Sequence, residues 1–82
     1  MNMLAAFDDT LALARARDFH QLEIEIPGLD YEHLLSMRDR ITPEFSEAKL
    51  GRWLGWAQCS LVANGVASLE EMKEINKRHS DD

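Results

Sequence analysis

The run from Ala48 to Val66, AKLGRWLGWAQCSLVANGV, constrains the fold most, because its apolar residues recur at helical spacing and an Asn-Gly pair closes it. One side of this helix is a large apolar stripe formed by Leu50, Trp53, Leu54, Ala57 and Leu61. Beside it, Gly51, Gly55 and Cys59 form a ridge of small residues. A glycine inside a helix costs about 1 kcal/mol relative to alanine. Two glycines in consecutive turns therefore predict close packing by another helix of the chain, a second copy or a foreign protein.

The N-terminal part of the chain predicts one helix and one extended piece. The helix is expected to begin near Asp8 or Asp9, either of which can cap free N–H groups, and to end at about Phe19. Met1 to Ala6 could add a further turn. Next, the sequence QLEIEI at Gln21 to Ile26 alternates apolar and acidic residues, which is a strand pattern. Because no other run alternates in this way, this piece, Leu22 to Ile26, is an extension of the first helix, an extended linker, or an edge that pairs with another molecule.

A second helix follows the break at Pro27-Gly28. Asp30 is its expected N-cap, and the helix is predicted over Tyr31 to about Arg40. The side chains expected to face inward are Tyr31, Leu34, Leu35 and Ile41.

Capping residues predict the remaining two helices. The third opens at Thr42, where Pro43 follows the cap, or at Ser46, and it ends at Asn64-Gly65. Ser68-Leu69-Glu70-Glu71 is a capping box that opens the fourth helix, whose inward residues are Met72, Ile75 and His79. The sequence therefore predicts an all-α fold: a small bundle of three to four helices with one short extended segment, as a single domain over residues 1–82.

Charge and composition narrow the class of partner. The 82 residues include nine basic and fifteen acidic ones, for a net charge of −6. That balance argues against a surface that tracks phosphates, and it fits a soluble protein whose partner carries a positive patch. A lone Cys59 cannot form an internal disulfide, and no apolar run approaches the ~20 residues of a membrane span. We expect a cytoplasmic protein that does not associate with membranes.

The pattern of polar residues does not suggest catalysis. His20, His33 and His79 are scattered, without the spacing of a metal-binding helix. The clusters of glutamate at residues 23–25 and 70–74 are explained by solvation, the helix dipole and pairing with Lys73, Lys77 and Arg78. We therefore expect no enzyme activity, no cofactor and no metal.

Candidate binding residues lie on the outer face of the third helix. Trp56 falls near Lys49, Arg52 and Cys59, whereas Trp53 falls on the apolar side as a core residue. An exposed tryptophan beside an arginine is typical of an interface hot spot. The alternatives are a tryptophan that covers the edge of the core, and a cysteine that is a small buried filler. For Gly51 and Gly55, the alternatives are packing against the first or second helix and close approach by a partner or a second copy.

Two basic pairs, Arg15/Arg17 and Arg38/Arg40, keep open a nucleic-acid reading in which the second and third helices act as a helix-turn-helix unit. The third helix carries only Lys49 and Arg52, and Glu44 and Glu47 precede them. Nucleic-acid binding is therefore disfavoured.

The C-terminal block Lys49 to His79 resembles the ending of small accessory proteins encoded by tailed bacteriophages. The residues that carry the resemblance are Leu50, Arg52-Trp53-Leu54-Gly55, Gln58, Gly65, Leu69-Glu70-Glu71-Met72 and Asn76. It implies a factor that binds a host protein, for example a component of a defence system such as CRISPR or a host regulator, and modulates or inhibits it. No functional residue carries over. The alternatives are a homodimeric assembly protein and a small DNA-binding regulator.

Overall fold

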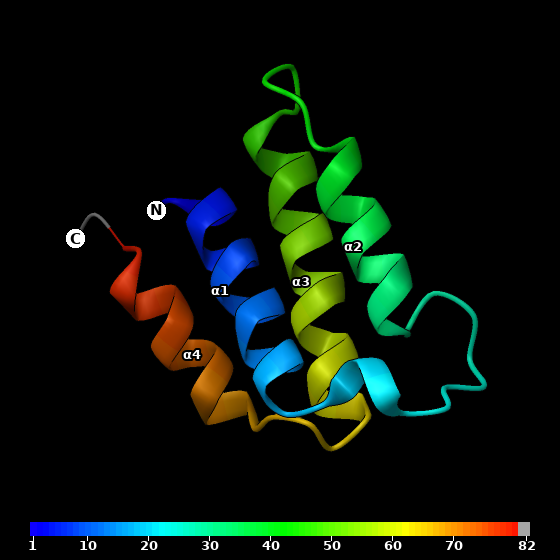
Figure 1. Cartoon of the computed structure of the whole chain (residues 1–82). Coiled ribbons are helices and arrows are strands. Elements are labelled where there is room, and N and C mark those ends of the chain that lie inside the picture. Colours follow the sequence, from blue (N-terminus) through cyan, green and yellow to red (C-terminus); the bar gives the residue numbers. More distant parts are fainter. Residues whose placement is uncertain (81–82) are drawn as a thin grey trace.

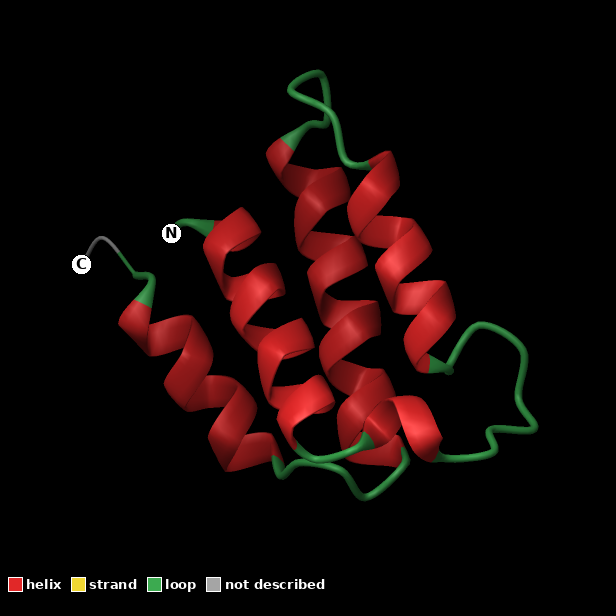
Figure 2. Cartoon of the chain, in the orientation of Figure 1, coloured by secondary structure: helices red, strands yellow, loops and turns green. Residues whose placement is uncertain are grey.

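The computed structural model describes residues 1–80, and four α-helices and one 3-10 turn account for most of them. The helices are α1 (Met3–Ala16), α2 (Tyr31–Arg40), α3 (Glu47–Ala63) and α4 (Leu69–Arg78), and the turn η1 (Phe19–Gln21) follows α1. Figure 2 shows only helices and loops along this part of the chain. The predicted all-α bundle is confirmed.

The first helix is the centre of the molecule, because α2, α3 and α4 all pack against it. Figure 1 shows α4 along one side of α1 and α3 along the other. The buried apolar side chains form one core, made of Ala6, Phe7, Leu11, Ala14, Phe19, Tyr31, Leu34, Met37, Leu54, Ala57, Leu61, Met72 and Ile75. Burial of each large side chain contributes roughly 1.5–3 kcal/mol, so every helix is held by what it adds to this core.

The bounds predicted for the first helix are wrong at both ends. It begins at Met3 because the Asn2 side chain accepts a hydrogen bond from the backbone N–H of Ala5 at 3.0 Å. The further N-terminal turn is therefore present, and Asp8 lies inside the helix, where it pairs with Arg38. The helix ends at Ala16 rather than Phe19, since Asp18 adopts a left-handed conformation with φ 62°.

Capping residues set the limits of the other helices. The Asp30 side chain caps α2, which has the predicted bounds, and Ser46 rather than Thr42 caps α3. Asn64 is the C-cap of α3, and Gly65 follows it with φ 70°. The capping box predicted at Ser68 is present, with both of its hydrogen bonds to Glu71.

The segment with strand-like alternation is a linker between η1 and α2. No residue from 1 to 80 is in a strand, so the alternation reflects half-burial of one side chain rather than sheet pairing. Ile24 packs against the core, whereas Leu22 and Ile26 are exposed. In α2, Leu35 is also exposed, contrary to the prediction, because the core takes only Tyr31, Leu34 and Met37 from this helix.

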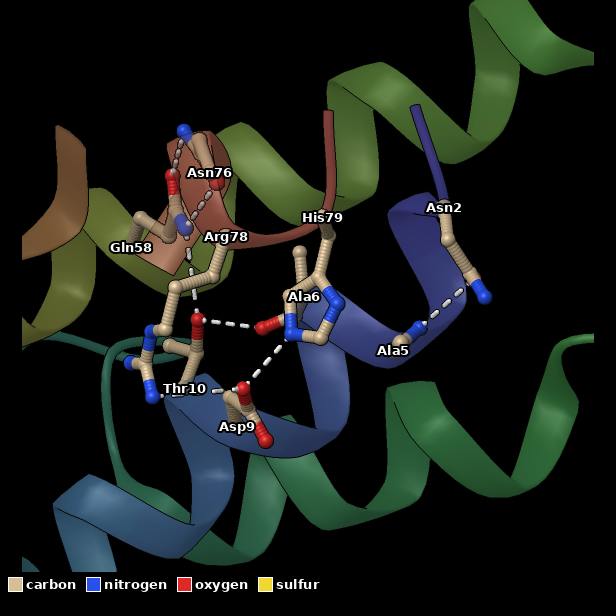
Figure 3. Close-up of polar contacts among 9 residues, drawn as sticks. All are labelled: Asn2, Ala5, Ala6, Asp9, Thr10, Gln58, Asn76, Arg78 and His79. Atoms are coloured by element: carbon tan, nitrogen blue, oxygen red, sulfur yellow. Dashed lines mark hydrogen bonds and ion pairs between the residues drawn. The ribbon is translucent and has the colours of Figure 1, made fainter. Parts of the chain in front are cut away.

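Polar contacts tie Asn2 and His79, near the two termini, to the bundle (Figure 3). The backbone N–H of Asn2 donates to the carbonyl of His79 at 2.7 Å, and His79 Nε2 lies 2.6 Å from Asp9 Oδ2. Gln58 and Asn76 exchange amide hydrogen bonds of 2.8 and 3.1 Å, and Gln58 Nε2 also donates to Thr10 Oγ1 at 3.3 Å. This polar triad joins α1, α3 and α4. None of the described helices is long and apolar enough to cross a membrane.

Candidate docking face on α3

The outer face of α3 carries the predicted binding residues, and the structure divides them between two grooves. Arg52 and Trp56 line a groove between α2 and α3, whereas Gly55 and Cys59 line a groove between α3 and α4. Lys49 lies nearer the start of α3, over the ring of Phe45. One helix therefore presents two different surfaces.

The α2–α3 groove has a volume of about 410 Å³, and its lining residues are His33, Met37, Arg40, Arg52, Trp53 and Trp56. Trp56 is 45% exposed, and its indole N–H donates to the carbonyl of Gly28 at 2.8 Å. Gly28 has φ 91°, and a Cβ there would lie 3.3 Å from the Trp56 ring. The turn that precedes α2 therefore holds this exposed ring in one orientation.

Cations lie over aromatic rings beside this groove, around Trp53. Trp53 is half-buried and meets the Phe45 ring edge-on, with 4.9 Å between the ring centroids. The Arg40 guanidinium carbon lies 5.3 Å from the Trp53 centroid, and Lys49 Nζ lies 4.2 Å from that of Phe45. Such contacts orient cations over the faces of aromatic rings. Trp53 thus packs at the edge of the core rather than within it.

Most cations elsewhere on the described surface are paired with carboxylates. Arg17 pairs with Glu71, Arg38 with Asp8, Lys73 with Glu70, and Arg78 with Asp9. Hydrogen bonding to Arg17 lowers the pKa of Glu71 to about 2, and the hydrogen bond to Asp8 raises the pKa of Arg38. In each of the two basic pairs seen in the sequence, one arginine binds a carboxylate from another helix: Arg17 binds Glu71, and Arg38 binds Asp8.

The cations around the α2–α3 groove have no such partner. Within residues 1–80, Arg40, Lys49 and Arg52 form no ion pair, and the Arg52 side chain makes no hydrogen bond or ring contact either. Arg40 donates only to the backbone carbonyl of Ser36, at 3.3 Å. The groove is therefore locally positive on a chain whose net charge is −6.

The α3–α4 groove corrects two expectations about small residues. Cys59 is exposed and is not a buried filler. A Cβ added at Gly55 would meet nothing within 4 Å, and one at Gly51 would meet only Met3 Sδ, at 3.5 Å. Close packing within the bundle is thus absent at Gly55, while close approach by a partner stays a prediction. The groove has a volume of about 290 Å³ and is lined by Gly55, Gln58, Cys59, Val62, Leu69, Met72, Lys73 and Asn76.

Sequence reasoning missed the contribution of α2 to the candidate site. His33, Met37 and Arg40 stand four and three residues apart, so they share one face of that helix. This spacing is visible in the sequence. However, these residues form one side of a groove only because α3 lies next to α2, and the spacing alone does not indicate that.

The titratable groups outside these grooves do not gather into a second site. In the described part of the chain, no three His, Cys, Asp or Glu side chains lie close enough together to hold a metal ion. His20 is half-buried, its ring lies 5.9 Å from that of Tyr31, and its Nδ1 is buried without a hydrogen-bond partner. Comparison with known proteins finds no matching family model, and no significant match to a curated protein or a solved structure.

Proposed function

We propose that this chain is a non-enzymatic protein-binding factor, encoded by a tailed bacteriophage, that docks on a host protein and modulates or inhibits it. The observation that supports docking is the exposure of Trp56, which a hydrogen bond to Gly28 holds in place beside the unpaired Arg52. Tryptophan and arginine are the residue types most enriched among interface hot spots. A ring that is already fixed loses little conformational entropy when a partner covers it.

The proposed docking face consists of Lys49, Arg52, Trp56 and Cys59, with Gly55 allowing close approach. All five lie on α3, and the open space above Gly55 leaves room for a partner's backbone or side chain. Such binding needs no cofactor, because a preformed helix face can lie directly against a complementary surface.

Affinity capture from a bacterial host lysate, with identification of bound proteins by mass spectrometry, tests this proposal. We expect one stoichiometric host protein, retained by the parent and lost with Gly55→Leu, a change at an exposed position where an added Cβ meets nothing within 4 Å in the free protein. Leu35→Ala is a matched control, since Leu35 is an exposed apolar residue of α2 that does not line the groove. Capture that is unchanged by Gly55→Leu would contradict the proposed face.

Trp56→Ala gives the quantitative form of the test. We expect it to weaken binding of the captured protein by about 2 kcal/mol or more, measured by titration calorimetry, as hot-spot truncation does. Trp56→Phe keeps an apolar ring but removes the N–H that donates to Gly28, so it separates ring contact from ring orientation. A folded Trp56→Ala variant that binds like the parent would remove Trp56 from the interface.

A homodimer is the second candidate, favoured by the α3–α4 groove. Gly55 is open there, and the exposed side chains Val62 and Leu69 flank it. Sedimentation equilibrium at micromolar concentrations distinguishes the two candidates. A dimer that Gly55→Leu dissociates would support self-assembly, whereas a monomer at all concentrations would exclude it.

A further inference from the structure

We infer that the α2–α3 groove binds an acidic, linear segment of the partner protein, whose carboxylates pair with Arg40 and Arg52 and whose apolar or aromatic side chain covers Trp56. This inference rests on the proposed docking function and specifies the chemistry of the partner at one of its two grooves. It also differs from the expectation set by net charge, which favours a basic partner.

Local charge is the first argument. Fifteen of the 82 residues are acidic, yet none of the six residues that line this groove is acidic, and two of them are arginines. Elsewhere on the described surface the ion pairs join arginines or lysines to carboxylates of the chain itself. Among residues 1–80, Arg40 and Arg52 have no such partner. A guanidinium binds a carboxylate through two parallel N–H donors, so these side chains are suited to an external carboxylate.

The aromatic lining is the second argument. Trp56 is held by its hydrogen bond to Gly28, and Trp53 contacts both the Phe45 ring and the Arg40 guanidinium. These rings supply apolar area next to the two cations. The groove therefore offers what an acidic segment with an interspersed apolar residue needs, and the orientation of Trp56 is set before binding.

The size of the groove sets the length of the segment. Its α2 side runs from His33 to Arg40, which spans roughly 10 Å at 1.5 Å per residue. An extended peptide advances roughly 3.3 Å per residue, so three or four residues cover this length. The volume of about 410 Å³ lies within the roughly 300–1,000 Å³ of pockets that bind small ligands, so the groove holds only part of a peptide.

A single-stranded nucleic acid also combines negative charge with planar rings, but the surroundings of the groove disfavour it. Exposed carboxylates at Glu32, Asp39, Glu44 and Glu47 stand on α2, on the α2–α3 loop and at the start of α3. A phosphate backbone carries negative charge along its whole length, so it is repelled by this acidic surface more than a segment of three or four residues is. We therefore assign the groove to a peptide.

Selection from a displayed library of random peptides, with the purified full chain as bait, tests this assignment without assuming a sequence. We expect the enriched peptides to be rich in Asp and Glu around an aromatic or aliphatic residue. With ¹⁵N-labelled protein, the best peptide should shift the indole N–H resonance of Trp56. A tenfold or greater loss of affinity is expected for Arg40→Gln/Arg52→Gln.

A matched double variant controls for net charge. Arg15→Gln/Lys77→Gln also removes two positive charges, and within residues 1–80 these two exposed side chains form no ion pair. It should change affinity by less than twofold. Because the exposed Arg52 side chain makes no hydrogen bond, ion pair or ring contact within residues 1–80, Arg52→Gln alone keeps the test valid if the double variant unfolds.

The inference would be overturned if no peptide is enriched, or if the enriched peptides are neutral or basic. It would also be overturned if the two double variants lose peptide affinity equally, or if a single-stranded oligonucleotide binds more tightly than any peptide. These outcomes are distinguishable from failure of the docking function itself. If the captured host protein depends on Trp56 while the selected peptides are not acidic, docking stands and the acidic partner is wrong. If acidic peptides bind at the groove but no host protein is captured, the groove's preference for acidic segments stands and docking on a host protein is wrong.

Discussion

At the scale of single residues, Gly55 is a helical glycine that no internal contact requires. Nothing lies within 4 Å of an added Cβ, and its φ is not among the positive values of the chain. We expect Gly55→Ala to stabilise the protein by about 0.5–1 kcal/mol, because alanine loses less backbone entropy than glycine in a helix. Urea unfolding followed by circular dichroism measures the change.

The control for this prediction is Gly65→Ala. Gly65 also has open space around it, but its φ of 70° is strained for alanine, so the same substitution should destabilise the protein there. A Gly55→Ala variant that is less stable than the parent would show that Gly55 is held by a contact within the fold.

Single residues also show what a sequence can and cannot predict. Asp30 and Ser68 were predicted as caps and are caps, because a cap depends only on neighbours three residues away. For Cys59 and Gly55 the sequence leaves two alternatives open, packing within the bundle and exposure to a partner, and the structure excludes only the first. Small size permits close packing but does not indicate whether a neighbour is close enough, and the groove between α3 and α4 leaves both residues open.

At the scale of elements, an ion pair joins the end of α1 to the start of α4. Both oxygens of Glu71 accept from the Arg17 guanidinium, and Glu71 Oε1 also accepts from the backbone N–H of Ser68 at 2.9 Å. These bonds lower the pKa of Glu71 from 4.5 to about 2. The stabilisation is therefore complete above pH 4.5 and is lost as the pH falls through about 2.

Glu71→Gln tests this dependence. The variant should be less stable than the parent at neutral pH, and the difference should shrink below pH 4.5 and vanish near pH 2. Urea midpoints at steps of pH provide the measurement. Glu74→Gln is the control, since Glu74 is exposed on the same helix and forms no ion pair with a residue in 1–80. A difference that stays constant with pH would mean that the charge of Glu71 does not contribute.

The bounds of a helix could be predicted where neighbouring residues gave consistent signals. They could not be predicted where contacts with residues far away in the sequence determine the structure. The bounds of α2 follow from the break at Pro27-Gly28 and the cap at Asp30. The alternating segment Leu22 to Ile26 carries a strand pattern, but a strand needs a partner that no other described segment supplies. Likewise, Asp8 and Asp9 have the residue type of a cap, yet they bind Arg38 and His79, which are far away in the sequence.

At the scale of the whole molecule, the polar triad of Thr10, Gln58 and Asn76 joins three helices through the core edge (Figure 3). Sequence reasoning assigned no role to these residues, because their spacing has no local pattern. The same limit applies to the α2–α3 groove, whose two sides become neighbours only when both helices pack on α1. Local sequence patterns therefore do not show which residues from different helices come into contact.

The triad has a measurable consequence for cooperativity. Gln58 is almost fully buried, and Gln58→Ala leaves the Asn76 amide without the partner that now satisfies both its donor and its acceptor. Asn76 is half-buried, so we expect a loss in the free energy of unfolding toward the lower end of the roughly 1–3 kcal/mol that an unpaired buried polar group costs. Relative to the parent, the exchange of backbone amides with deuterated solvent should speed up more in α4 than in α2, because α4 loses its polar link to α3 in the variant.

Replacement of both partners separates hydrogen bonding from packing. Gln58→Leu/Asn76→Leu removes the two amides together and keeps apolar volume between α3 and α4, so it should be more stable than Gln58→Ala. Gln21→Ala is the surface control, since Gln21 is exposed and should cost less than about 0.5 kcal/mol. If Gln58→Leu/Asn76→Leu is instead less stable than Gln58→Ala, the two amides do more than satisfy each other's hydrogen bonds. They would then determine how α4 is oriented on the bundle.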